Sequence, residues 1–367
     1  MPDDPRREIH RFDLSVPLDS ASTPPSSWYT DPAVHRIEMR RVLGNNWLAA
    51  ARAGQVATPG RYVCGEIAGE RYVIVRGEDG ELRAFYNVCR HHAAAVVTGD
   101  GTAKRLTCPY HGWTYGLDGR LLNAPELGAV KDFDPDHVGL VPMAVQTWGP
   151  FVFICMGETP RDLAADLLGL KDALDRTRFE ALTFVASRTY TLACNWKVYV
   201  DNYLDGGYHV AYLHKGLAAQ LDLASYGTHV YDRYSIQSGA GKTGHTAEPG
   251  GDFAERVGKQ VLYAWIYPNF MINRYGSIMD TNRVIPRGVD RTEVVFDYYF
   301  AETGKEFIRR SIAASDVVQQ EDAGICEAVQ RGLASRSYDT GRYSAKLEMG
   351  EHHYHRLLAE DLRAECD

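Results

Sequence analysis

The sequence has 367 residues, of which 45% are hydrophobic and 24% charged, and its formal net charge is −8. This composition is typical of a globular protein with a large core, and the length favours two or three domains. The acidic balance, with no basic stripe, argues against a nucleic-acid partner. No run approaches the length of apolar residues that a membrane span needs, so no membrane association is expected.

The N-terminus and the cysteines bear on location. The first residues, MPDDPRREIHRFDLSVPLDS, are acidic and proline-rich. They lack the apolar core of a secretory signal, and a transit peptide would lack the acidic residues. Seven cysteines are scattered along the chain. An odd, scattered set fits a reducing compartment, where cysteines are buried thiols or metal ligands. We therefore expect a cytoplasmic protein.

The predicted elements change character along the chain. Residues 1–45 predict an irregular arm and a helix that packs on the C-terminal domain. Residues 46–158 contain short runs of β-branched and aromatic residues between Gly, Asp and Asn turns, with a hairpin signal at 117–119. Residues 159–367 mix strand-like runs with helices, one over 159–174 that starts at Thr-Pro and one over 305–333. The pattern predicts an all-β domain followed by a mixed α+β domain.

The first candidate site is formed by two short motifs, CRHH at 89–92 and CPYHGW at 108–113. Each mixes one cysteine with one histidine and follows a predicted strand. A zinc site accepts two cysteines and two histidines, but the C-x-H spacing of Cys89 and His91 is tighter than zinc motifs use. The set suits a Rieske [2Fe–2S] centre, with Cys89 and Cys108 on one iron and His91 and His111 on the other.

The neighbouring histidine is a rival for the first motif. A ligand at His92 would give C-x-x-H spacing in both motifs, a pattern closer to zinc, so the spacing selects His91. His92 is expected to face solvent or an interface. Gly112 would allow the backbone to approach a cluster closely, and Trp113 and Tyr115 could shield it or donate to it.

The second candidate site lies in DNYLDGGYHVAYLH, residues 201–214. His209 and His214 are about 140° apart on an ideal helix, so they do not share one face. They can converge only if a helix starts or bends there, which the preceding Gly206-Gly207 pair allows. Two histidines and one carboxylate on one face of Fe(II) form the site of non-haem oxygenases. Asp322 in QQEDAG is our candidate carboxylate, and Glu321 is its rival.

The stretches NVCRHH, CPYHGWTYGLDG, NWKVYVDNYLDGGYHVAYLH and QQEDAGICEAVQRGL together resemble the oxygenase α subunits of Rieske non-haem iron oxygenases. The resemblance spans about residues 40–355. It implies a Rieske domain and a helix-grip catalytic domain. In residue terms, Cys89, His91, Cys108 and His111 match the cluster ligands. His209, His214 and Asp322 match the ligands of the mononuclear iron.

The resemblance also implies a homotrimer, with the alternative of two stacked trimers. In the family, the cluster of one subunit feeds the iron of its neighbour through a bridging carboxylate. Many members carry that carboxylate three residues before the first iron histidine, where this chain has Gly206. Asp205 is the expected bridge here, and Asp201 is another option. The Asp-Gly-Gly variant is similar to the choline monooxygenase branch.

Further similarity to that branch lies in VLYAWIYPNFMINRYG, VVFDYYF and the GEHHYH stretch, and it implies oxidation of a quaternary ammonium or N-methyl compound. Tyr263, Trp265 and Tyr267 alternate along a predicted strand, with Phe270 and Tyr275 nearby. Such an aromatic wall would hold a quaternary ammonium by cation–π attraction. Filling of a sheet core by the same rings is the competing interpretation.

We therefore expect an oxygenase that uses O2, a [2Fe–2S] cluster and Fe(II). No Gly-rich dinucleotide fingerprint follows a strand, so NAD(P)H would act only through a separate flavin/iron–sulfur reductase. Ring dihydroxylation and O- or N-demethylation are alternatives within the family. A zinc-stabilised binding module is the alternative from another class. A pure electron carrier is disfavoured by the second His–His–Asp set.

Overall fold

The structure is a computed structural model, and it describes residues 4–242, 260–301 and 304–364. The chain divides into two compact units, one of residues 43–164 and one of residues 1–42 with 165–367. None of the described helices combines the length and the apolar character that crossing a bilayer requires.

The unit of residues 43–164 is built on a seven-stranded sheet in the order β1-β10-β9-β4-β3-β2-β5, in which neighbours run antiparallel. Its strands are β1 (Leu48–Arg52), β2 (Arg61–Ile67), β3 (Glu70–Arg76), β4 (Leu82–Tyr86), β5 (Asp100–Thr102), β9 (Pro142–Trp148) and β10 (Phe151–Cys155). Alternating buried side chains such as Val73 and Val75 form its core. The prediction of an all-β first domain is confirmed.

A second, three-stranded sheet in this unit consists of β6 (Leu106–Thr107), β7 (Thr114–Tyr115) and β8 (Leu121–Asn123). The hairpin predicted at 117–119 connects β7 and β8. Gly119 has φ +85° there, and a Cβ would lie 2.5 Å from the ring of Phe85, so only glycine fits.

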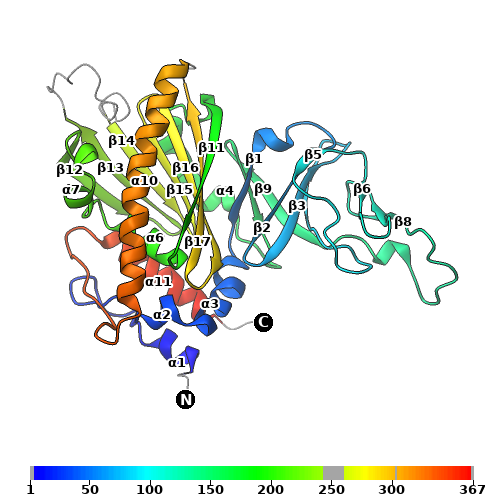
Figure 1. Cartoon of the computed structure of the whole chain (residues 1–367), viewed down its shortest axis with the longest axis horizontal. Coiled ribbons are helices and arrows are strands. Elements are labelled where there is room, and N and C mark those ends of the chain that lie inside the picture. Colours follow the sequence, from blue (N-terminus) through cyan, green and yellow to red (C-terminus); the bar gives the residue numbers. More distant parts are fainter. Residues whose placement is uncertain (1–3, 243–259, 302–303, 365–367) are drawn as a thin grey trace. The chain divides into compact units, whose positions relative to one another are not determined.

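The larger unit contains a seven-stranded antiparallel sheet in the order β11-β17-β16-β15-β14-β13-β12. Its strands are β11 (Thr183–Leu192), β12 (Leu221–Val230), β13 (Tyr234–Gly241), β14 (Gln260–Ile266), β15 (Phe270–Tyr275), β16 (Ile278–Gly288) and β17 (Arg291–Phe300). Helices α6 (Trp196–Leu204), α10 (Lys305–Leu333) and α11 (Met349–Arg363) accompany the sheet, and α10 and α11 both contact α6. Figure 1 shows α10 running along the sheet. The predicted α+β class is confirmed.

The helix expected over 159–174 differs from the observed structure. It is two short helices, α4 (Leu163–Asp166) and α5 (Leu168–Asp175). The start is set by Asp162, whose carboxylate accepts a hydrogen bond from the amide of Ala164 at 3.0 Å. An aspartate cap of this kind satisfies one of the amides that have no partner within the helix at its start.

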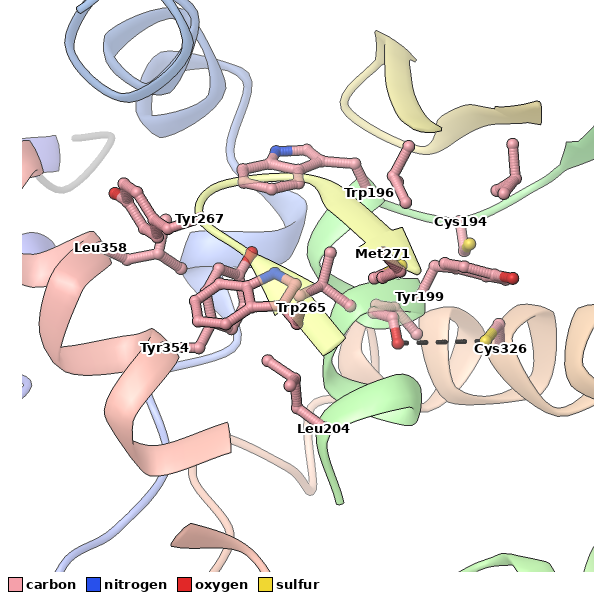
Figure 2. Packing of buried hydrophobic residues seen from close by; sticks show 14 of the residues in the cluster. Cys194, Trp196, Tyr199, Leu204, Trp265, Tyr267, Met271, Cys326, Tyr354 and Leu358 are labelled. Carbon is pink, nitrogen blue, oxygen red and sulfur yellow. Dashed lines mark hydrogen bonds between the residues drawn. The ribbon is translucent and has the colours of Figure 1, made fainter. Parts of the chain in front are cut away.

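The core of the larger unit is aromatic where α6 meets α11 and the sheet (Figure 2). The rings of Trp265 and Tyr354 meet edge to face at 5.3 Å, and Trp196 meets Tyr354 at 6.1 Å. Such edge-to-face contacts add to the free energy gained by burying the rings. This packing fixes α6, whose C-terminal end leads into the second candidate site.

The N-terminal arm belongs to the larger unit through helices α1 (Pro5–His10), α2 (Ser27–Thr30) and α3 (Pro32–Glu38). Glu38 at the end of α3 forms an ion pair with Lys197 on α6, and both side chains are fully buried. Trp196 Nε1 also donates to Glu38 Oε2 at 3.2 Å. A buried pair with further hydrogen bonds ties the arm to α6 because separating it would leave an uncompensated charge.

Candidate metal centres

The two motifs of the first site form turns with matching backbone geometry. The amide of Ala93 donates to the carbonyl of Cys89 at 2.9 Å, and the amide of Gly112 donates to that of Cys108 at 3.1 Å. Ala93 and Gly112 both have positive φ, +57° and +75°. Each turn therefore folds tightly behind its cysteine, and both cysteines are buried.

The structure brings all four predicted ligands of this site together. Cys89 and Cys108 are buried in the same core cluster. The imidazoles of His91 and His111 are 4.7 Å apart between ring centroids. His92 is exposed, as expected for a residue that faces solvent or an interface.

The chemistry of this donor set fits a [2Fe–2S] cluster. It offers two sulfur and two imidazole donors, and the Nδ1 atom of His91 is buried without a partner among the described residues. Burial raises the pKa of Cys89, but hydrogen bonds from the Tyr115 hydroxyl and the amides of His91 and His92 lower it to a value below normal. Such donors favour the thiolate, which is the form that binds iron.

Trp113 and Tyr115 line this site, as the sequence suggested. The Trp113 indole stacks on His91 at 4.8 Å with an interplanar angle of 3°. The Tyr115 hydroxyl lies 3.4 Å from Cys89 Sγ. Tyr110, in contrast, is 64% exposed and stacks on His111 at 3.8 Å. The cysteine side of the site is thus enclosed, and the His111 side faces outward.

The two histidines of the second site flank a single helical turn, α7 (Val210–Leu213). His209 precedes this turn and His214 ends it with φ −100° and ψ 69°. Because the helix is this short, the rotation of an ideal helix does not separate the rings, and their centroids lie 4.9 Å apart. The convergence expected from the Gly206-Gly207 break is therefore present.

Asp322 on α10 completes this group, and the donor atoms of the three residues lie within 4.8 Å of one another. His214 Nε2 lies 3.0 Å from Asp322 Oδ1, and His209 Nε2 lies 3.9 Å from it. Burial disfavours the charged imidazole, but Asp322 and Glu321 raise the pKa of His214 above its usual value. A cation would be stabilised at this position by the same two carboxylates, so the residues fit a mononuclear iron.

The opposite nitrogen of each histidine is held by a second carboxylate. Asp205 Oδ2 lies 2.6 Å from His209 Nδ1, and Glu321 Oε2 lies 2.7 Å from His214 Nδ1. Carboxylates bonded to Nδ1 fix the ring and the tautomer, and leave Nε2 to coordinate a metal. The two candidate carboxylates on α10 therefore have different positions. Glu321 contacts Nδ1 of His214, whereas Asp322 lies on the Nε2 side, where a metal would be coordinated.

The Gly206 position cannot hold a bridging carboxylate. Its φ is +71°, and a Cβ would lie 2.2 Å from the carbonyl oxygen of Leu347. Asp205 instead accepts hydrogen bonds from the amides of Gly207 and His209, both at 2.9 Å. Asp201, the other option, contacts Tyr29 and His355 rather than either iron-site histidine.

A cavity with an empty volume of about 620 Å³, including its mouth, opens beside His209, His214 and Asp322. Five tyrosines line it, namely Tyr199, Tyr203, Tyr226, Tyr263 and Tyr275. Tyr263 is central, since its ring meets Tyr203 at 6.5 Å, Tyr226 at 6.1 Å and Tyr275 at 5.6 Å.

The three residues expected to form one aromatic wall are placed differently. Tyr263 lines the cavity, whereas Trp265 is fully buried against Tyr354. Tyr267 lies beyond the end of β14 and donates to Asp361 on α11 at 2.7 Å. The core-filling interpretation therefore holds for Trp265 and Tyr267.

Sequence reasoning missed several residues of this site. Tyr203 and Tyr226 come from α6 and β12 and reach the cavity only in the folded chain. Asn202 donates to Asp322 Oδ1 at 2.9 Å. The sequence predicts Glu321 only as a rival ligand, not as the partner of His214 Nδ1. The one available signal was helical spacing, because Asn202 lies three residues before Asp205, at the end of the same helix.

Two family descriptions match the chain. Residues 46–134 match the Rieske [2Fe-2S] domain, and residues 179–364 match the ring hydroxylating alpha subunit (catalytic domain). Together with the two donor sets, these matches define a Rieske non-haem iron oxygenase with a [2Fe–2S] cluster and a catalytic iron.

Relatives cover nearly the whole chain. A chloroplastic choline monooxygenase of Arabidopsis thaliana is 43% identical over 97% of this chain and 86% of its own length. The oxygenase subunit of carnitine monooxygenase from Escherichia coli is 33% identical over 95% of this chain and 97% of its own. A solved quaternary ammonium Rieske monooxygenase superposes with a TM-score of 0.85 at 30% identity, covering 94% of this chain and 97% of that chain. The chain belongs to the α subunits of the Rieske ring-hydroxylating oxygenase family, as the sequence motifs predicted.

Proposed function

We propose that this chain is a terminal oxygenase that hydroxylates a small quaternary ammonium or N-methyl compound. The observation that carries the proposal is the tyrosine-lined cavity beside His209, His214 and Asp322. Tyrosine faces attract quaternary ammonium groups by about 0.5–2 kcal/mol per contact. No lysine or arginine is among the described residues that line the cavity, so nothing in that part of the wall repels a cation.

The relatives support the same substrate class. Their names specify choline and carnitine, and both compounds carry a trimethylammonium group. Within the class, the polar groups of the described wall are uncharged amides and phenols apart from the iron-site residues, for example Gln237 and Asn273. They suit a neutral polar substituent such as a hydroxyl group.

The proposed residue roles follow the donor sets. Cys89, Cys108, His91 and His111 hold the cluster, and His209, His214 and Asp322 hold the iron. When bound, the cluster relays single electrons and the iron activates O2. Asp205 is the proposed electron bridge. Its carboxylate contacts His209 Nδ1, and it also accepts a hydrogen bond from the amide of Tyr208 in an exposed turn.

Electrons are proposed to come from NAD(P)H through a separate flavin/iron–sulfur reductase. We also propose a homotrimer, in its simplest form or as two stacked trimers. Near the iron site Tyr208 and Tyr212 are 46% and 78% exposed, and near the cluster site Tyr110 is 64% exposed. Exposed aromatic rings around both sites suit contact with another subunit.

We also propose that the domains divide at 45/46 and 158/159, and that the protein is cytoplasmic.

Inter-subunit transfer can be tested by complementation. Subunits carrying Cys108→Ala lack the cluster, and subunits carrying Asp322→Ala lack the iron. Each variant alone should be inactive, whereas co-expressed mixed oligomers should recover part of the activity. No recovery in mixed oligomers would show that electrons stay within one subunit.

The substrate class is tested by oxygen uptake with a panel of choline, betaines, carnitine, and methoxy- and carboxy-arenes, with a reductase supplied. We expect uptake and hydroxylated product with a trimethylammonium compound. A cis-diol from an arene would instead show ring dihydroxylation, and loss of a methyl group as an aldehyde would show demethylation. A colourless protein containing zinc would identify a binding module.

A further inference from the structure

A second polar cluster lies between α6 and α11, apart from the residues that line the cavity. Donor atoms of Asp201, Glu351 and His355 lie within 4.8 Å of one another. His355 is completely buried, whereas Asp201 and Glu351 keep partial access to solvent. These residues belong neither to the proposed cluster ligands nor to the proposed iron ligands, and the proposed electron path does not include them.

Hydrogen bonds already engage two members of this cluster. Asp201 Oδ2 accepts from the Tyr29 hydroxyl at 2.8 Å, and its Oδ1 lies 3.0 Å from His355 Nε2. His355 Nδ1 lies 2.7 Å from the Tyr343 hydroxyl. Both the carboxylate and the imidazole are therefore satisfied by neighbours, which argues for a proton-holding network rather than an empty metal site.

Glu351 is the exception. Its side chain makes no hydrogen bond to the described residues, although its donor atom lies within 4.8 Å of those of Asp201 and His355. Burial and the nearby acidic groups Asp201, Glu348 and Asp205 raise the pKa of Glu351 well above its usual value. Two carboxylates this close, one with donors and one without, cannot both ionise cheaply, so the proton resides on the one without donors.

The surroundings offer little positive charge to offset these acids. The titratable or charged groups near the cluster come from α2, α6, the segment before α11, and α11 itself: Tyr29, Lys197, Asp201, Asp205, Tyr343, Glu348 and His355. Lys197 is engaged by Glu38 in the buried ion pair. The cluster therefore retains a proton without a compensating cation among these groups.

We propose that Glu351 is a carboxylic acid at neutral pH and, with Asp201 and His355, forms a proton store that supplies turnover. The supply role rests on the proposed function. Hydroxylation follows RH + O2 + 2e⁻ + 2H⁺ → ROH + H2O, so each turnover consumes two protons. One proton leaves the Glu351 carboxyl group for the oxygen atom released as water. The second proton comes from solvent, which also reprotonates Glu351 at its partly exposed edge. The position is apt because Asp201 lies one helical turn before Asp205 on α6, and Asp205 contacts His209.

Infrared spectroscopy of the metal-loaded protein at pH 7 tests the protonation state directly. A protonated carboxyl group has a C=O stretch that is separate from carboxylate bands and shifts in D2O. We expect Glu351→Gln to lose one such band, and the exposed Glu360→Gln on the same helix to keep it. Glu351→Met, similar in volume, should lose the same band if the Gln variant does not fold. An unchanged band in the Glu351 variants would overturn the proposal.

Turnover tests the supply role. With iron and cluster contents matching those of the unmodified protein, Glu351→Gln should form product in a single turnover at least about 100-fold more slowly, at the lower end of what a positioned proton donor contributes. Glu360→Gln should react at the normal rate. A normal rate in Glu351→Gln would refute the supply role. If the band is present but no trimethylammonium compound is oxidised, the proposed substrate fails and the protonated Glu351 stands.

Discussion

Glu321 Oε2 lies 2.7 Å from His214 Nδ1, while the adjacent Asp322 places Oδ1 3.0 Å from Nε2 of the same ring. Two consecutive carboxylates of α10 thus hold opposite sides of one imidazole. The first orients the ring, and the second lies on the side that would coordinate the metal. The ring is 2% exposed, so solvent does not compete for these contacts.

Replacing Glu321 with Ala should weaken iron binding at the mononuclear site by about 10–100-fold, as expected when the carboxylate behind a metal-binding histidine is lost. Glu321→Gln retains an acceptor for Nδ1–H and should lose less. Iron titration of the metal-free protein measures the effect, with the exposed Gln320→Ala as the control. Equal affinity in Glu321→Ala and in the control would contradict the positioning role.

Replacing Asp322 with Ala should empty the mononuclear site and abolish oxygenation. The cluster should remain, because its four donors come from a different unit of the chain. Iron and sulfide analysis together with the visible absorbance of the cluster measure both effects. Simultaneous loss of iron from both sites would show that the two donor sets have been assigned incorrectly.

Replacing Gly206 with Ala should destabilise the protein more than the same change at Gly69. Both residues have positive φ, but a Cβ at Gly206 would lie 2.2 Å from Leu347 O, whereas Gly69 has nothing within 4 Å. The control should lose about 1–2 kcal/mol of unfolding free energy from backbone strain alone. The Gly206 variant should lose at least about 2 kcal/mol more. Chemical denaturation measures both, and equal losses would exclude the clash.

His352 should make stability depend on pH. Burial and nearby positive groups lower the pKa of His352 to about 4. The unfolded chain therefore binds this proton more readily than the folded protein, and stability falls as the pH drops from about 6.5 toward 4. This residue should cost roughly 2–3 kcal/mol across that range.

His352→Phe should remove that part of the acid sensitivity, since a phenyl ring can occupy the space between Phe12 and Tyr343 without taking up a proton. The exposed His10→Asn serves as the control. Urea denaturation at pH 7 and pH 4.5 gives the comparison. An acid sensitivity that is the same in both variants would place its origin elsewhere.

Replacing Tyr263 with Leu should raise KM for a trimethylammonium substrate about 2–30-fold, the equivalent of about 0.5–2 kcal/mol of cation–π attraction. A neutral analogue with a tert-butyl group should be affected less, since it is held by apolar contact alone. Tyr231→Leu, a 44% exposed position outside the cavity lining, is the matched control. An equal effect on the charged and neutral compounds would argue against cation recognition.

The two metal-binding motifs could be read from the sequence because their donors are close along the chain. Cys89 and His91 share one turn, as do Cys108 and His111, and a local turn is fixed largely by local residues such as Gly112. The strand-rich character of the first domain could be predicted in the same way, from short runs of β-branched and aromatic residues between turns. Such patterns record local geometry directly.

The rest depends on tertiary contacts that no local pattern encodes. Glu321 and Asp322 are equally plausible ligands in the sequence, and only the approach of His214 from another element assigns them different roles. Likewise Tyr263 and Trp265 share one face of β14, but the packing of Tyr354 from α11 covers Trp265 and leaves Tyr263 at the cavity.

Anomalous X-ray scattering at the iron edge, on crystals of the protein purified with its metals, tests the two-centre assignment most directly. We expect a pair of iron atoms between Cys89, Cys108, His91 and His111. A single iron atom should lie between His209, His214 and Asp322. No iron signal at the first position, or zinc at either, would contradict the assignment of this chain as an oxygenase with two iron centres.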